Sequence, residues 1–305
     1  MPAESGIERS TTATARHGIA ESPRELARLP AAVRPPTGAE TALAHAHEEL
    51  LATEEDGIAV LTLSRPHRRN ALSRTLLATL ADRLAAFDAS PVRAVVLEGA
   101  DGCFSAGADL GELEGSEADL TMDDAVAEAA RAVRRLGVPV VAALEGPCIG
   151  AAIELAAACD LRVASETAFF EIPAVRLGVL YRPGAVAELA TVLPRDTLVR
   201  LLLFGERIEA AEAAAVGLVT PPVAPPGGAR SAAIERAQAY AERLPHAAWP
   251  AARATKRLLA SLTAETDASE RRRTIDELEA ERRRLAASAE RVAALERKRP
   301  RRPTP

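Results

Sequence analysis

In the stretch Leu144-Glu-Gly-Pro-Cys-Ile-Gly-Ala-Ala-Ile-Glu-Leu-Ala-Ala-Ala-Cys-Asp160, the acidic residue Glu154 stands in a small-residue turn that runs into a helix. Burying an ionised carboxylate without a partner is costly, so such a group usually raises its pKa, as a general acid or base near neutral pH requires. Most glutamates lie on a solvated face. The apolar neighbours Ile153 and Leu155 favour burial here. The preceding residues, Gly150, Ala151 and Ala152, would let a ligand approach backbone N–H groups that have no partner within the helix. The stretch therefore predicts a backbone oxyanion site beside an acid/base.

A second segment has the same character. The apolar run Ala94-Val-Val-Leu-Glu-Gly-Ala100 predicts a strand, and it ends in the small-residue loop Asp101-Gly-Cys-Phe-Ser-Ala-Gly-Ala-Asp-Leu110. A strand that leads into a Gly/Ala-rich loop lets a backbone N–H approach a ligand closely. Taken alone, such a loop more often only makes a turn.

Together, the two segments resemble the crotonase superfamily, also called the enoyl-CoA hydratase/isomerase family. The resemblance covers roughly residues 50–300, and its motifs occur in family-like order and spacing. These motifs are Asp56-Gly-Ile-Ala-Val-Leu-Thr-Leu-Ser-Arg-Pro-His-Arg-Arg-Asn-Ala-Leu72, Ala106-Gly-Ala-Asp109, Pro139-Val-Val-Ala-Ala-Leu-Glu-Gly146, Glu154-Leu-Ala-Ala-Ala-Cys-Asp160, the stretch 202–218 and Ala294-Leu-Glu-Arg-Lys-Arg-Pro300.

The resemblance implies that the substrate is an acyl-CoA thioester and that coenzyme A enters only as part of it, with no other cofactor. Ala108 and Ala151 fall on the positions whose backbone N–H groups form the oxyanion hole, and Glu154 falls on one of the two glutamates of the hydratases. The implied CoA-binding residues are Arg68, Arg69, Ala106 and Lys298. The expected acyl pocket is lined by Leu110, Leu113, Ala174, Val175, Leu180 and Tyr181.

One position departs from the family pattern. Two-glutamate hydratases carry their second carboxylate directly after a proline in Phe-Gly-x-Pro-Glu, where this chain reads Phe170-Glu-Ile-Pro-Ala174. Glu171 is an alternative acid, but in an extended segment its side chain would face away from position 174; in a loop that parity argument fails. With Glu154 alone, a single-base proton shift, a one-carboxylate hydration or elimination, and decarboxylation with enolate protonation remain open. A non-catalytic crotonase-fold binding or scaffold protein is the alternative from another class.

Composition is that of an ordinary acidic enzyme. The 305 residues carry a formal net charge of −5, which gives no general reason to expect a nucleic-acid or membrane partner. No run of 18 or more apolar residues and no signal peptide is evident, so we expect a cytoplasmic location. The three cysteines, Cys103, Cys148 and Cys159, and the five histidines form no metal-ligand pattern, so we expect no metal site.

The chain is predicted to have three parts: a mobile leader over 1–48, a crotonase-like core over 49–225 and a helical oligomerisation region over 226–305. Apolar β-branched runs alternate with Ala/Leu stretches in the core, which predicts an α/β fold around a largely parallel sheet; for this family it is wound as a spiral of ββα units. Thr41–Glu54 is predicted as a short helix. The resemblance implies a homotrimer or a dimer of trimers. Predicted strands are Ile58–Leu63, Ala94–Leu97, Val138–Ala142 and Leu161–Val163, and predicted helices are Leu72–Phe87, Asp123–Leu136, Gly150–Ala158 and Ala185–Leu193.

Overall fold

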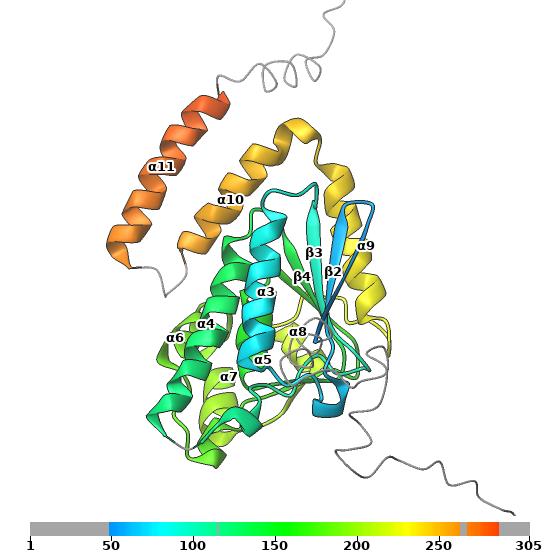
Figure 1. Cartoon of the computed structure of the whole chain (residues 1–305), viewed down its shortest axis with the longest axis vertical. Coiled ribbons are helices and arrows are strands. Elements are labelled where there is room, and N and C mark those ends of the chain that lie inside the picture. Colours follow the sequence, from blue (N-terminus) through cyan, green and yellow to red (C-terminus); the bar gives the residue numbers. More distant parts are fainter. Residues whose placement is uncertain (1–48, 115, 263–266, 287–305) are drawn as a thin grey trace, which may run out of the picture. The chain divides into compact units, whose positions relative to one another are not determined.

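The larger sheet contains five strands in the order β1-β2-β3-β4-β6 (Figure 1). The computed structural model describes residues 49–114, 116–262 and 267–286, and the predicted leader lies outside these ranges. β1 is antiparallel to β2, and every other neighbouring pair in this sheet is parallel. The strands are β1 (Leu50–Glu55), β2 (Ile58–Leu63), β3 (Ala94–Gly99), β4 (Val140–Leu144) and β6 (Leu161–Ala164).

A smaller sheet has the strand order β5-β7-β8. Two of its strands follow strands of the larger sheet in the sequence: β5 comes after β4, and β7 comes after β6. It consists of β5 (Pro147–Ile149), β7 (Phe169–Glu171) and β8 (Ile208–Glu209). The chain passes from β4 through β5 into the helix α5 (Ala151–Ala158), and then from β6 into β7. Two successive turns, β4 with β5 and β6 with β7, therefore each contribute one strand to each sheet, in agreement with the predicted ββα spiral.

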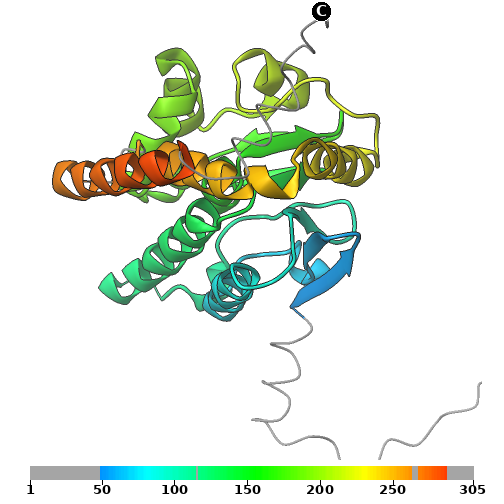
Figure 2. The ribbon, with the colours of Figure 1, turned by 90° about the horizontal axis from the view of Figure 1, so that it is seen from above.

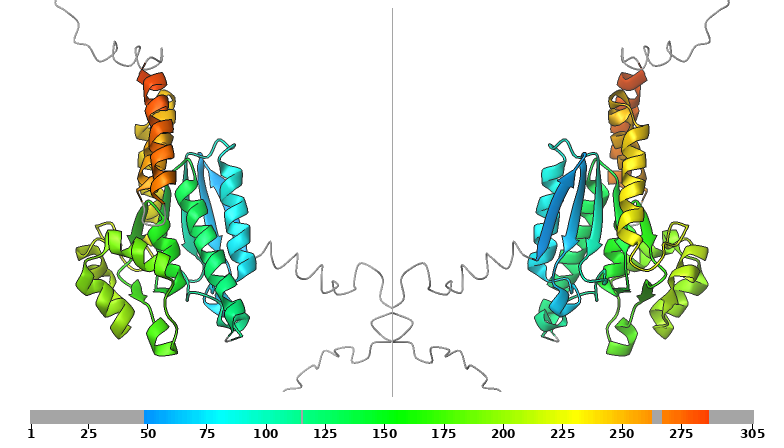
Figure 3. Two further views of the ribbon diagram at one scale, coloured as in Figure 1. Left: turned by 90° about the vertical axis from the view of Figure 1, so that its left-hand side faces the viewer. Right: turned by 90° about the vertical axis from the view of Figure 1, so that its right-hand side faces the viewer.

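Helices pack on both faces of the larger sheet (Figures 2 and 3). Alternate residues of β2 divide between two apolar clusters: Ala59 and Leu61 join the main core, whereas Ile58 and Val60 face the helix α9 (Ala229–Arg243). The main core is completed by the helices α3 (Arg74–Phe87), α4 (Leu120–Arg135) and α5. α9 presents alanines at four-residue spacing, Ala229, Ala233, Ala237 and Ala241, which lets it lie close to the sheet.

The predicted helix over Thr41–Glu54 is wrong where the structure describes it, because residues 50–54 belong to β1. Asp56 and Gly57 have φ values of 52° and 76°, the left-handed pair that a tight hairpin requires. This turn pairs β1 with β2 along all six residues of each strand. An Asp-Gly pair between two runs of strand-forming residues is a hairpin signal, and it outweighs the helical propensity of the Ala/Glu-rich segment before it.

The remaining helices lie in the second half of the chain: α6 (Pro183–Val192), α7 (Arg195–Val199), α8 (Ala210–Ala215), α10 (Trp249–Ser261) and α11 (Ala268–Ala286). α10 contacts α4, and α11 runs beside α10 (Figure 1). Lys256 of α10 forms an ion pair of 2.7 Å with Asp160 and donates a 2.8 Å hydrogen bond to the carbonyl of Val138. The C-terminal helices are thus tied to the sheet, and a domain boundary between residues 225 and 226 stays a prediction. None of the helices in the described ranges combines the length and apolarity that a membrane crossing requires.

Candidate active site

Glu154 is buried, as the sequence predicts. It lies in the first turn of α5 with 6% of its surface exposed, between the fully buried Ile153 and Leu155. The helix starts directly after Gly150, whose φ of 55° and ψ of −122° suit a residue without a Cβ. The N–H of Gly150 donates to the carbonyl of Glu171 over 2.8 Å, so β7 holds the point at which α5 begins.

The loop that follows β3 lies against the start of α5. The N–H of Ser105 donates to the carbonyl of Pro147 over 3.0 Å, and the N–H of Ile149 donates back to the Ser105 carbonyl over 3.1 Å. Gly107 has a φ of 90°, and a Cβ added to it would lie 2.5 Å from the Ile149 oxygen and 3.5 Å from the Ala151 nitrogen. The segments that carry the predicted oxyanion donors, Ala108 and Ala151, therefore meet. Their binding of an oxyanion stays a prediction.

An ion-pair cluster fixes the far end of this loop. Arg65 forms ion pairs of 2.8 Å with both Glu49 and Asp109. Asn70 joins the turn after β2 to the loop, because its side chain accepts from the N–H of Arg65 and donates to the carbonyls of Ala100 and Cys103. Burial by itself would raise the pKa of Asp109, but the hydrogen bonds from Arg65 and from the N–H of Gly111 outweigh it and lower that pKa. The loop that carries Ala108 is thus anchored by a paired, ionised aspartate.

This anchor predicts a pH-dependent loss of stability. A carboxyl whose pKa is lower in the folded than in the unfolded state stabilises the fold above its unfolded pKa, about 3.9 for aspartate, and stops doing so as the pH falls through the folded value. Asp109→Asn should therefore be less stable than the natural protein at neutral pH, and the difference should shrink below about pH 3.9. Urea unfolding at a series of pH values measures it. A difference independent of pH would show that Asp109 acts through packing alone.

Arg182 is the partner of the buried glutamate. Its guanidinium group forms an ion pair with the carboxylate of Glu154 and is 18% exposed. The arginine precedes α6, 28 residues after Glu154 in the chain. It also influences Asp123 of α4: burial raises the pKa of Asp123, and the charge of Arg182 opposes that rise. No motif in the sequence signals Arg182, and its ion pair gives the buried carboxylate of Glu154 a partner that the sequence does not predict.

Tyr181 also lies at the start of α5, because its hydroxyl donates a 3.0 Å hydrogen bond to the carbonyl of Gly150. Burial, with the nearby charge of Glu154 as a further cause, raises the pKa of Tyr181 well above its usual value. The phenol therefore stays a neutral donor. Tyr181 connects the segment before α6 to the residue that precedes Ala151.

Two positions bear on a second acid: Glu171, and Ala174, where two-glutamate hydratases carry their second carboxylate. Glu171 pairs with Arg176 and, over 3.7 Å, with Arg207, and its side chain is 15% exposed. Ala174 begins a 3-10 turn, Ala174–Leu177, after Pro173 has left the extended conformation with a ψ of 7°. The parity argument for an extended strand thus does not apply. Two arginines hold the carboxylate of Glu171, and whether it replaces the missing second acid stays a question for experiment.

The remaining predicted residues divide into packed and exposed groups. Leu113, Ala174 and Tyr181 pack against the main core, whereas Leu110, Val175 and Leu180 are exposed on this chain. In the described part of the chain, none of these six lines the two cavities that adjoin Glu154 and its partner Arg182. Their role as an acyl pocket stays a prediction.

Three of the four predicted CoA-binding residues lie near one another. The N–H of Ala106 donates to the carbonyl of Arg69 over 2.9 Å, and the charge of Arg68 is close enough to Asp109 to lower its pKa further. Arg69 likewise opposes the rise that burial causes in the pKa of Cys103. Lys298 lies outside the described residues. No group of three or more His, Cys, Asp or Glu side chains in the described ranges could hold a metal ion.

The chain forms a spiral of mostly parallel strands, in which the small-residue loop after β3 meets the start of α5. This arrangement is that of the crotonase class of α/β proteins, and solved structures of that class match the fold. The family model described as enoyl-CoA hydratase/isomerase matches residues 53–298, and the chain belongs to this family.

Individual relatives agree with this assignment. A probable enoyl-CoA hydratase of Rhizobium meliloti is 35% identical over 69% of this chain and 80% of its own length. The 2,3-dehydroadipyl-CoA hydratase of Escherichia coli is 34% identical over 56% of this chain and 68% of its own. The crystal structure of an enoyl-CoA hydratase from Polaromonas sp. JS666 has a TM-score of 0.70 and 30% identity, covering 82% of this chain and 97% of that one. The chain is therefore an enzyme that acts on acyl-CoA thioesters.

Proposed function

We propose that this enzyme stabilises an enolate of its acyl-CoA substrate and moves the proton with one carboxylate, Glu154. The backbone N–H groups of Ala108 and Ala151 donate to the thioester oxygen, on which negative charge develops. Two fixed donors of this kind are worth several kcal/mol, since removing one typically costs about 3–4 kcal/mol of barrier. The observation that carries the proposal is the burial of Glu154 three residues after Ala151, on a helix start that touches the Gly107 loop.

Glu154 serves as the base in this scheme. Helical side chains tilt toward the N-terminus, so Glu154, in the first turn of α5, leans toward the end at which the N–H of Ala151 has no partner within the helix. The carboxylate of Glu154, which is held by the ion pair with Arg182, accepts a proton from the carbon next to the thioester. The same carboxyl, once protonated, returns the proton to the enolate. A one-carboxylate cycle supports isomerisation, hydration or elimination on a single acid/base, and enolate protonation after decarboxylation.

A panel of thioesters separates these reactions. The purified enzyme is incubated in deuterated water with enoyl-, 3-hydroxyacyl- and malonyl-CoA thioesters, and the products are weighed by mass spectrometry. Addition of water, loss of carbon dioxide or exchange of deuterium alone identifies the class. Because position 174 is an alanine and Glu171 is paired, we expect slow hydration of crotonyl-CoA. Rapid hydration would show that a second carboxylate takes part, and binding of no thioester would favour the scaffold alternative.

The proposed assembly is a trimer or a dimer of trimers. Its support is a set of large apolar side chains that are more than half exposed on the single chain, since extended apolar patches mark interaction surfaces. Two groups of them lie in adjacent segments, around Leu177 and around Phe204. Others lie on and after α10, at Leu259 and Leu262. Light scattering should give three or six times the chain mass of 32.1 kDa, and a monomer would contradict this proposal. A cytoplasmic location stays a prediction.

A further inference from the structure

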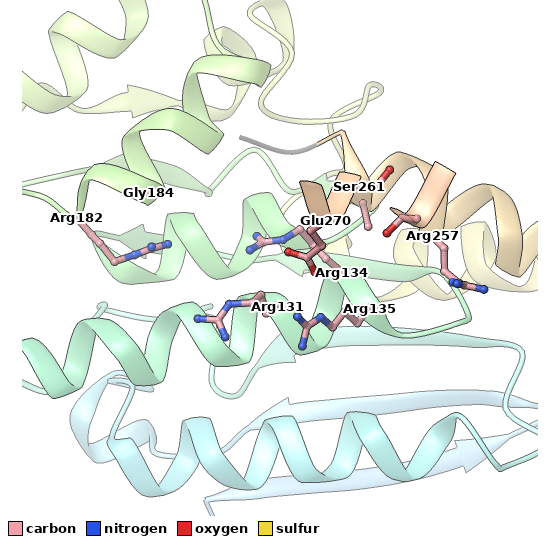
Figure 4. Close-up of a pocket in the computed structure, with 10 residues that line it drawn as sticks. Arg131, Arg134, Arg135, Arg182, Gly184, Arg257, Ser261 and Glu270 are labelled. Atoms are coloured by element: carbon pink, nitrogen blue, oxygen red, sulfur yellow. The ribbon is translucent and has the colours of Figure 1, made fainter. Parts of the chain in front are cut away.

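A cavity of about 770 Å³ lies beside the Glu154 ion pair, and arginines dominate its wall (Figure 4). Arg131, Arg134 and Arg135 come from the last two turns of α4, while Arg182 and Arg257 enter from two other elements. We call this space the arginine cavity. Its lining is Arg131, Arg134, Arg135, Arg182, Gly184, Arg257, Ala260, Ser261, Glu270 and Thr274. Its volume falls in the range of small-molecule sites, about 300–1,000 Å³.

The charge of this wall differs from that of the rest of the protein. Among the described residues, five arginines and one glutamate, Glu270, line the cavity, although acidic residues outnumber basic ones in the whole chain by 43 to 38. Arg131 and Arg135 are four residues apart on one helix, a spacing at which like charges destabilise the helix. Two of the arginines also pair with acidic side chains that are more than half exposed: Arg131 with Glu128 and Arg257 with Glu277. Such exposed pairs are screened by solvent and contribute little to stability, so a ligand carboxylate can compete with them.

The arginine cavity adjoins the proposed catalytic carboxylate. Arg182 lines the cavity and also pairs with Glu154. Arg134 and Ala260 line both this cavity and a smaller one of about 240 Å³, which has Glu154 itself in its wall. The smaller cavity has a mixed lining that includes the acidic residues Glu154, Asp160 and Glu188 and the basic residues Arg134 and Lys256. Among the described residues, arginines therefore predominate in the arginine cavity and not in the smaller one.

We propose that the arginine cavity binds the free carboxylate of an acyl-CoA thioester whose acyl group derives from a dicarboxylic acid. Arg131 and Arg134, both half-buried on one side of α4, receive that carboxylate through charge-assisted hydrogen bonds. This inference rests on the proposed function, because the thioester end must lie at Ala108 and Ala151 for the far end of the acyl group to pass Glu154. A bound carboxylate would also offset the mutual repulsion of the arginines. The negative charge at the far end of the acyl group thus defines the proposed substrate class.

Binding of matched saturated thioesters tests the proposal without turnover. Isothermal titration calorimetry compares succinyl-, glutaryl- and adipyl-CoA with butyryl-, valeryl- and hexanoyl-CoA, which have the same numbers of acyl carbons and no free carboxylate. At least one dicarboxylic thioester should bind about tenfold or more tightly than its partner, since a hydrogen bond to a charged group is worth about that factor. The methyl ester of that ligand removes the charge at nearly constant length, and its affinity should fall to that of the uncharged thioester.

Arginine variants locate the effect. Arg131→Gln and Arg134→Gln should each reduce the preference for the dicarboxylic thioester by about tenfold and leave the affinity for the uncharged partner unchanged. Arg134→Lys keeps the charge but not the two-pronged geometry and should retain part of the preference. Arg83→Gln, which removes an exposed arginine of α3 outside the cavity lining, is the matched control and should change neither affinity. Thermal unfolding of each variant confirms that it is folded.

Three results would overturn the proposal, and they are distinguishable. Equal affinity for the members of every pair would refute the carboxylate site while leaving the proposed function intact. An equal loss of affinity for both members and for free coenzyme A in the arginine variants would assign these side chains to the coenzyme phosphates. Failure of every thioester to bind would reject the proposed function itself.

Discussion

Glu154→Gln is expected to lower turnover of the acyl-CoA substrate by a factor of about 100 or more, the usual contribution of a general acid/base. Glutamine has nearly the same size and shape as glutamate but cannot take up or release the proton. The two backbone donors, Ala108 and Ala151, are unchanged by the substitution, so the thioester should still bind with an affinity close to that of the natural enzyme. Steady-state kinetics together with calorimetric binding of a saturated thioester measure the two effects separately.

The substitution also has a cost in stability that must be measured beside the rate. Removing one partner of a buried ion pair costs about 3–5 kcal/mol, and somewhat less is expected here because Arg182 is 18% exposed. Glu171→Gln is the matched control, since Glu171 is also a mostly buried glutamate that is paired with arginines. It should lose stability but keep its turnover. Turnover lost in Glu171→Gln would identify that carboxylate as the missing second acid, and full turnover in Glu154→Gln would remove Glu154 from the mechanism.

The sequence predicts most of the fold because the strands are short apolar runs between turn signals. β2 has the predicted bounds, Ile58–Leu63, and β3, β4 and β6 begin within two residues of prediction. The sequence does not predict the first strand, β1, because its residues belong to an Ala/Glu-rich segment that favours a helix, and only the Asp56-Gly57 turn indicates its pairing with β2. Whether such a segment forms a strand depends on the partner strand with which it pairs, and the propensities of its own residues do not include that partner.

At the site, the sequence predicts the features that depend on residues close together in the chain. It does not predict contacts between side chains that are distant in the sequence. The burial of Glu154 follows from its apolar neighbours within one helix, and the meeting of the two small-residue segments follows from the motifs on which the resemblance rests. The ion pair with Arg182 joins side chains from two different elements, and neither residue alone signals the other. The described lining of the arginine cavity comes from four helices, α4, α10, α11 and the start of α6, which are spread along the sequence. Its arginines therefore form no single local motif in a chain that is acidic overall.

Gly107→Ala should be nearly as damaging to turnover as the loss of Glu154, although residue 107 has no side chain to take part in chemistry. The new Cβ would lie 2.5 Å from the carbonyl oxygen of Ile149, which is closer than any such contact tolerates. Since the Ile149 oxygen and the Gly107 backbone are both held in place, the loop and the start of α5 must move apart, which would separate the proposed oxyanion donors, Ala108 and Ala151. Loss of one donor from such a pair typically lowers turnover by a factor of about 100–1,000.

Gly102→Ala separates this effect from ordinary backbone strain. Gly102 lies in the same connection after β3 and also has a positive φ, 67°, but a Cβ there would meet no atom within 4 Å. Both variants pay the cost of a left-handed alanine, about 1–2 kcal/mol, so both should unfold at lower temperature. Only Gly107→Ala should also lose turnover, as measured by steady-state kinetics well below its unfolding temperature. Because the clash lies between Gly107 and the residues that lead into Ala151, equal activity in the two variants would mean that the catalytic donors are not held by this contact.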